Sequence, residues 1–187
     1  MTDLRLNLAG SGMVAISTDA LAALRSSLMR DTGHAAAGYL QEAGYAGGPA
    51  LFQAYRDWLT KCGADSPDSL SVAAFQRHAA DFFRESGWGS LTVGDLHDVV
   101  ATLDSPDWGE ATADARLDHP SCHLSAGMFA DFFGRVADAP LAVMEVECRS
   151  AGGERCRFLL GSMEVMQQVY EEMSRGTGYE AAVEAAA

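Results

Sequence analysis

Apolar side chains recur at helical spacing in several stretches of the chain. In residues 50–63, ALFQAYRDWLTKCG, the apolar positions fall on one stripe with polar residues opposite, which is typical of an amphipathic helix. Capping residues such as Ser at the start and Gly at the end bound several similar stretches. The pattern predicts helices over these segments: 17–30, 50–63, 69–87, 121–137 and 162–176.

The segment 33–48, GHAAAGYLQEAGYAGG, is unusually rich in glycine and alanine. Each glycine lowers helix propensity, while small residues allow close backbone approach. Two interpretations remain open. The segment is a loosely built helix that ends in a turn at Gly47-Gly48-Pro49, or it forms a close-packed seam against another helix or a second chain.

Short runs of β-branched residues between turn signals predict strands. A hairpin is expected around the turn RSAGGE at 149–154. The expected strands are 13–18, 88–96, 97–105, 108–117, 140–148 and 155–162. The order of elements predicts an α+β fold, with an antiparallel sheet covered by helices and an N-terminal helical region. We expect a single domain over 1–176, with helices in 18–87, the sheet in 88–176, and a frayed tail over 177–187.

Composition and charge exclude some classes of partner. The chain has 187 residues, 48% of them apolar, which suits one domain with a substantial core. Its net charge of −13 argues against nucleic acid and against an anionic membrane surface, since both attract clustered Lys and Arg. No run reaches the roughly 18–20 apolar residues of a membrane span, and the N-terminus lacks the pattern of a signal peptide. We therefore expect a cytoplasmic protein whose four cysteines are reduced or bind metal.

Three cysteines indicate a metal site. Cys148 and Cys156 flank the hairpin turn, and Cys122 opens the helix predicted over 121–137. Zinc prefers four tetrahedral ligands, so a fourth residue is needed. The candidates for this fourth ligand are Glu145, Glu147, Glu154, His119 and His123.

Strand alternation does not choose among the glutamates. Glu145 and Glu147 both point away from Cys148 in an unbroken strand, and Glu145 joins it only if the strand ends or bulges between them. Three semi-buried thiols with no metal remain the alternative, because cysteine is among the most buried residues.

The run from Cys122 to Phe158 resembles the C-terminal signature of the 4-vinyl-reductase-like domain family, which also supplies the sensory domains of phenol- and toluene-responsive activators. The matching features are Cys122, Gly127, FFGR at 132–135, Glu145-Val-Glu-Cys148, Gly152-Gly153 and Cys156-Arg-Phe. The resemblance covers about residues 20–175, and FFRESGWGSLTV at 82–93 also fits it.

The resemblance implies the identity of the metal ligands. In the sensor branch the corresponding residues bind one zinc, which implies Cys122, Glu145, Cys148 and Cys156 here, at intervals of 23, 3 and 8 residues. It also implies a fold shared with vesicle-tethering subunits and a homodimer formed through the N-terminal helices.

Four protein ligands leave no open position for water, so we expect a structural zinc rather than a catalytic one. The sequence lacks the His-x-Glu and Pro-Cys-x-x-Cys motifs of zinc deaminases, a P-loop and a Gly-x-Ser-x-Gly elbow. An enzyme is therefore poorly supported.

Large apolar residues near the predicted sheet could line a ligand pocket or simply form the core. These residues are Trp88, Trp108, Met128, Phe129, Phe132 and Phe133. Our main interpretation is a zinc-stabilised homodimeric sensor or carrier of a small hydrophobic or aromatic molecule, with a downstream signalling partner. The alternatives are an accessory factor or reductase for the vinyl group of a (bacterio)chlorophyll precursor, a pure assembly module, and a thiol redox switch.

Overall fold

The fold is built on one antiparallel sheet. The structure is a computed structural model that describes residues 10–186. The strands are β1 (Thr92–His97), β2 (Val100–Ser105), β3 (Leu141–Glu147) and β4 (Cys156–Ser162). Their order across the sheet is β1-β2-β4-β3, so β1 and β3 are the edge strands. Both hairpins expected from the sequence are present, and the expected α+β class is confirmed.

Helices precede, interrupt and follow the sheet. They are α1 (Thr18–Thr32), α2 (Ala35–Lys61), α3 (Val72–Glu85), α4 (His123–Ala137), α5 (Met163–Ser174) and α6 (Tyr179–Ala186), with short 3₁₀ turns η1 (Pro67–Ser69), η2 (Ala113–Ala115) and η3 (Arg149–Ala151). Serine hydroxyls at Ser17, Ser71 and Ser162 accept a backbone N–H in the first turns of α1, α3 and α5. These caps satisfy N–H groups that have no partner within the helix. None of the helices in residues 10–186 has the length and apolar character needed to span a bilayer.

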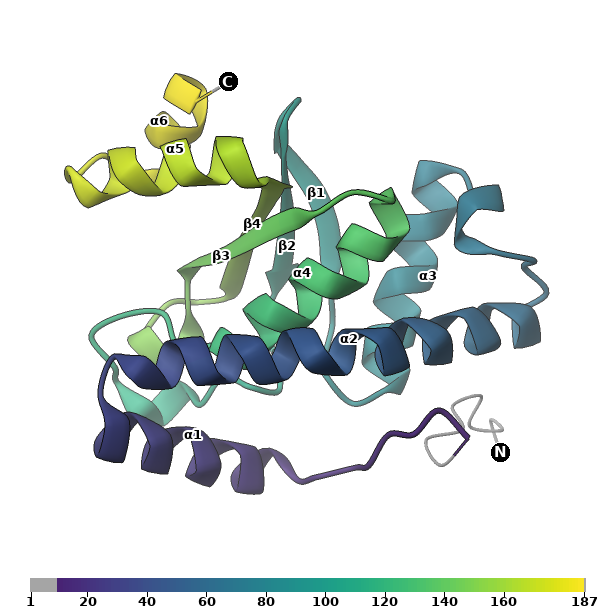
Figure 1. Cartoon of the computed structure of the whole chain (residues 1–187), viewed down its shortest axis with the longest axis horizontal. Helices are drawn as coiled ribbons and strands as arrows, with labels where there is room; N and C mark the ends of the chain where they lie inside the picture. The colour runs from purple at the N-terminus through teal and green to yellow at the C-terminus, as the bar shows by residue number, and fades with distance from the viewer. Residues whose placement is uncertain (1–9, 187) are drawn as a thin grey trace.

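Helices cover both faces of the sheet (Figure 1). On one face α5 and α6 pack through Met166, Val169 and Val183 against Val100 and Leu159. On the other face lie α4 and, behind it, α2, with α3 alongside. This second layer encloses the larger core, which is dominated by aromatic rings, so the sheet face under α4 is the best-insulated part of the molecule.

The glycine-rich segment forms the first half of one long helix. The expected turn at Gly47-Gly48-Pro49 is wrong, because α2 continues to Lys61 with Pro49 inside it. A Cβ on Gly44 would overlap the carbonyl of Leu124 in α4, and a Cβ on Gly127 of α4 would overlap the carbonyl of Gln41. Glycine is thus required on both helices because their backbones touch.

Three further segments differ from expectation. Residues 13–17 form no strand, and Val14 and Ile16 are exposed there. The stretch 108–117 is a loop rather than a strand, because its backbone N–H groups bond Ser150: Thr112 donates to the hydroxyl at 2.9 Å and Leu117 to the carbonyl at 2.7 Å. The segment expected to fray instead contains α6, whose Ala182 and Val183 are buried against the sheet.

Candidate metal centre and aromatic core

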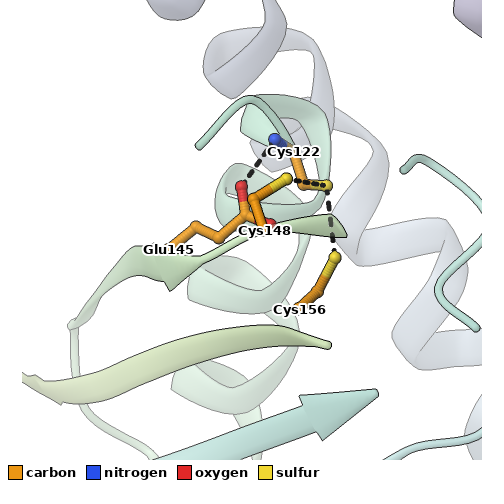
Figure 2. A group of neighbouring side chains, drawn as sticks. All are labelled: Cys122, Glu145, Cys148 and Cys156. Carbon is orange, nitrogen blue, oxygen red and sulfur yellow. Dashed lines mark hydrogen bonds between the residues drawn. The ribbon is translucent and has the colours of Figure 1, made fainter. Parts of the chain in front are cut away.

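Four side chains from three elements converge beneath the N-terminus of α4 (Figure 2). Cys122 is the residue before α4, Glu145 comes from β3, Cys148 follows β3, and Cys156 begins β4. Their ligand atoms all lie within 4.8 Å of one another, and the three cysteines are buried. Within residues 10–186 this is the group of His, Cys, Asp and Glu side chains arranged to hold a metal ion.

An irregularity in β3 brings Glu145 to the cysteines. The pairing of β3 with β4 shifts between Glu145, which lies opposite Phe158, and Glu147, which lies opposite Arg157. The extra residue reverses the alternation beyond it, as a β-bulge does. Glu145 therefore faces α4 while Glu147 bonds Arg155 at 2.9 Å and the hydroxyl of Tyr179 at 2.6 Å. The bulge satisfies the condition that the sequence alone left open.

The sulfur spacing suits a metal better than a disulfide. The Cys122 Sγ lies 3.8 Å from the Cys148 Sγ and 3.9 Å from the Cys156 Sγ. Tetrahedral zinc with Zn–S bonds of ~2.3 Å separates its sulfurs by about 3.8 Å, whereas a disulfide bond is ~2.05 Å long. Three thiols and one carboxylate are a donor set that zinc accepts, so the residues fit this ion.

The carboxylate of Glu145 is half satisfied. Its Oε2 accepts a hydrogen bond from the backbone N–H of Cys122 at 2.8 Å, while Oε1 is buried without a partner in the described structure. A buried oxygen in this condition is disfavoured unless a cation or a proton binds it. Glu145 also lines a groove of about 420 Å³ between α4, β3 and α5, which gives solvent a route to the centre.

Protons occupy the centre when no cation does. Burial, followed by the charge of Cys148, raises the pKa of Glu145 to about 8. The neighbouring thiols of Cys148 and Cys156, together with burial, raise the pKa of Cys122 well above its ordinary value. A divalent cation reverses this preference, since it stabilises thiolate and carboxylate directly. Metal binding therefore displaces protons from these residues.

A second buried carboxylate positions α4. Glu110 accepts the backbone N–H of Leu124 at 3.1 Å and that of Ser125 at 2.7 Å, as well as the Ser125 hydroxyl. Burial raises its pKa, although these hydrogen bonds and the charge of Arg25 act in the opposite direction. The guanidinium of Arg25 in α1 donates to the backbone carbonyl of Glu110, which ties α1 to the helix that carries Cys122.

The expected pocket residues gather in the aromatic core on the same side of the sheet. Trp88 stacks on Trp108 with ring centroids 5.4 Å apart, and Trp108 contacts Phe129 at 5.0 Å. Phe132 and Phe133 continue the cluster at 5.1 Å, and Met128 is buried in the same core. The indole N–H of Trp108 donates to the Ser125 hydroxyl at 2.7 Å. The aromatic core is thus bonded to the residue that Glu110 holds at the start of α4.

The metal cluster and Glu110 all fall within one family match. Residues 110–162 match the family model of the 4-vinyl-reductase domain. The match confirms the resemblance to the 4-vinyl-reductase-like family for this segment, which contains all four residues of the cluster.

One curated relative matches a short part of the chain. It is the uncharacterized protein MJ0745 of Methanocaldococcus jannaschii, 27% identical over 77 residues. The match covers 41% of this chain and 41% of that protein, so the chain spans about two fifths of the length of its relative.

Two solved structures resemble the fold. The phenol-responsive sensory domain of the transcription activator PoxR, solved with phenol, has a TM-score of 0.64 and 20% identity over 83% of this chain and 78% of its own. A vinyl-4-reductase family protein from Methanocaldococcus jannaschii has a TM-score of 0.48 and 18% identity over 65% of this chain and 66% of its own. The first likeness shows that the architecture is shared over most of the chain.

Sequence reasoning missed three buried polar residues: Arg25, Glu110 and Ser125. Nothing in their local sequence separates them from surface residues, because charged side chains are mostly exposed. Of the other candidates for the fourth ligand, Glu154 and His119 are exposed and Glu147 faces Arg155.

Proposed function

We propose that this protein is a zinc-stabilised domain that binds a small hydrophobic or aromatic molecule as a sensor or carrier. The observation that carries the proposal is that α4 serves both sites. It begins at Cys122 in the metal cluster and supplies Phe129, Phe132 and Phe133 to the aromatic core. Fixing α4 to the β3–β4 hairpin would therefore also fix one wall of the ligand site.

The zinc is structural in this proposal. Cys122, Glu145, Cys148 and Cys156 supply a full tetrahedral set, which leaves no position for a reacting water. The ion would fasten the end of β3 and the start of β4 to α4, and it would satisfy the orphaned Oε1 of Glu145.

The aromatic core supports the ligand class. Rings around Trp108 offer apolar faces for a flat molecule, and Trp108 and Ser125 add polar atoms beside them. The fold shared with a phenol-responsive sensory domain makes a small aromatic molecule the first ligand to test. The residues proposed to line the site are Trp88, Trp108, Met128, Phe129, Phe132 and Phe133.

A homodimer is part of the proposal. Leu24 of α1 and Tyr39 and Tyr45 of α2 are more than half exposed, so the outer side of this helix pair presents large apolar groups to solvent. Large exposed apolar residues that gather on one surface commonly mark an interface. A sensor of this kind, in the cytoplasm, would report its state to a partner protein.

Binding to the zinc-loaded protein tests the ligand proposal. Trp88 and Trp108 lie in the proposed site, so phenol should change the tryptophan fluorescence in a saturable way, and isothermal titration should give one site per chain. Phe129→Ala should weaken binding, while Val72→Ala, an exposed change on α3, should not. Absence of saturable binding by phenol, toluene and larger aromatic probes would contradict the proposal and favour a pure assembly module.

A further inference from the structure

Tyr55 carries a buried hydroxyl that the protein does not satisfy. It lies on α2 with no exposed surface, and its oxygen has no hydrogen-bond partner within the described residues. A buried hydroxyl without a partner loses its bonds to water and gains none in return. Phenylalanine would fill the same space without this penalty, so the packing of the ring alone does not explain a tyrosine here.

The neighbours of Tyr55 are mainly aromatic rings. Its ring centroid lies 5.2 Å from that of Phe82, 5.3 Å from Phe132 and 6.4 Å from Phe75. Trp58 stacks against it at 6.3 Å, but the indole N–H of Trp58 already donates to Glu85 at 2.8 Å. The hydroxyl therefore sits among apolar faces, in an environment that strengthens any hydrogen bond formed there.

The hydroxyl remains a neutral donor at physiological pH. Burial, followed by the charge of Cys62, raises the pKa of Tyr55 well above its ordinary value. A neutral phenol O–H can donate one hydrogen bond and accept others. It suits a ligand oxygen of either character, such as a hydroxyl or a carbonyl, and it disfavours no neutral partner.

We infer that the Tyr55 hydroxyl is the polar anchor for the ligand, and that the ligand is a small aromatic molecule bearing one oxygen substituent. This inference rests on the proposed function and deepens it. Phe132 belongs both to the proposed lining and to the rings around Tyr55, so the anchor lies at the edge of that site. Phe82 and Phe132 lie nearly parallel, with 10° between their planes, and present faces against which a ligand ring would pack.

Tyr55 differs from the other polar group of the aromatic core in being unengaged. The Trp108 indole N–H is bonded to Ser125 at 2.7 Å, so a ligand would have to replace an existing hydrogen bond there. At Tyr55 a ligand oxygen gains a hydrogen bond without breaking one. A site with an unsatisfied polar group discriminates strongly between ligands that supply the partner and ligands that do not.

Phenol and toluene form the matched probe pair, since they differ by a hydroxyl in place of a methyl. Isothermal titration of the zinc-loaded full chain should show tighter binding of phenol than of toluene. Tyr55→Phe should weaken phenol binding about tenfold, as expected for loss of one hydrogen bond, and leave toluene binding unchanged. Tyr39→Phe, on the exposed side of the same helix, is the control and should change neither.

The melting temperature without ligand supplies a second readout. Tyr55→Phe should leave it unchanged or raise it, because the lost hydroxyl has no partner. A lower melting temperature would mean that the hydroxyl bonds the protein, and would overturn the inference. An undiminished preference for phenol in Tyr55→Phe would overturn the inference alone, while leaving the proposed function standing. Failure of both probes to bind the unmodified protein would overturn the proposed function, and the anchor with it.

Discussion

The backbone N–H of Cys122 donates a hydrogen bond of 2.8 Å to the Glu145 carboxylate, joining the start of α4 to β3 (Figure 2). The contact depends on the bulge after Glu145, which turns this carboxylate toward α4 and Glu147 away from it. The same carboxylate keeps a second oxygen buried and unpartnered. Glu145 therefore supports α4 and remains available to a cation.

Replacing a cysteine of the centre should remove metal and stability together. We expect Cys148→Ser or Cys156→Ser to lose bound zinc, because the three sulfurs lie at the spacing of a single tetrahedral ion. The free energy of unfolding should then fall by about 4 kcal/mol when free zinc is a thousandfold above its Kd. Elemental analysis and thermal unfolding check both effects on the same samples.

Cys62→Ser is the matched control, since Cys62 lies outside the cluster. It should retain zinc. A Cys148→Ser protein that loses zinc but unfolds at the same temperature would show that the ion does not stabilise the fold.

Zinc affinity should fall as the pH is lowered. The pKa of Glu145 is raised to about 8 and that of Cys122 is raised well above its usual value, so the metal-free protein holds protons at both residues near neutral pH. Zinc must displace them, and its affinity should drop roughly tenfold per pH unit for each proton displaced. The stabilisation by added zinc should thus shrink between pH 8 and pH 5.

Glu145→Gln should weaken zinc binding and make the pH dependence shallower, because one of the displaced protons is gone. Glu147→Gln, whose carboxylate pairs with Arg155 on the other side of the strand, is the control and should keep the original slope. Equal slopes in all three proteins would argue that Glu145 is not a ligand. Competition with a chelator of known affinity provides the measurement.

Glu110 should be a stabilising residue although it lies outside the metal centre. Glu110→Gln keeps the size of the side chain but leaves one N–H of its amide facing N–H groups of α4, so we expect a loss of about 1–3 kcal/mol in unfolding free energy. Glu164→Gln, in the exposed first turn of α5, should change stability by less than about 0.5 kcal/mol. Urea unfolding separates the two, and equal effects would refute a special role for Glu110.

The contact between α2 and α4 should tolerate no side chain. Gly127→Ala places a methyl group against the Gln41 carbonyl and should lower stability by about 1–3 kcal/mol through overpacking. Gly38→Ala lies on α2 with no atom near its Cβ position, and it should raise stability by about 0.5–1 kcal/mol through helix propensity. Thermal unfolding of both variants checks the pair, and a stabilised Gly127→Ala would mean that the helices can move apart.

Much of the fold follows from periodicity, whereas several site features do not. The hairpin around 149–154 and the helix beginning near Cys122 predicted the approach of three cysteines, and the structure agrees. Alternation could not select Glu145, because a bulge depends on how β3 pairs with β4. The glycines of 33–48 suggested close approach but not its partner, which proves to include α4 of the same chain.

Buried polar groups were the least predictable part. The side chains of Glu110 and Arg25 resemble ordinary surface charges in the sequence, and their roles follow from loops that pair with distant residues. Tyr55 fits its amphipathic helix as well as phenylalanine would, so only the burial of its oxygen reveals the missing partner.

Native mass spectrometry of the full chain, purified without chelator, tests the central claim most directly. The account expects one zinc per chain, lost in Cys148→Ser and retained in Cys62→Ser, and an added mass when phenol is supplied to the zinc-loaded protein. The same spectrum reports the expected dimer. A metal-free chain that is fully folded and takes up no aromatic molecule would contradict both the zinc centre and the binding function built on it.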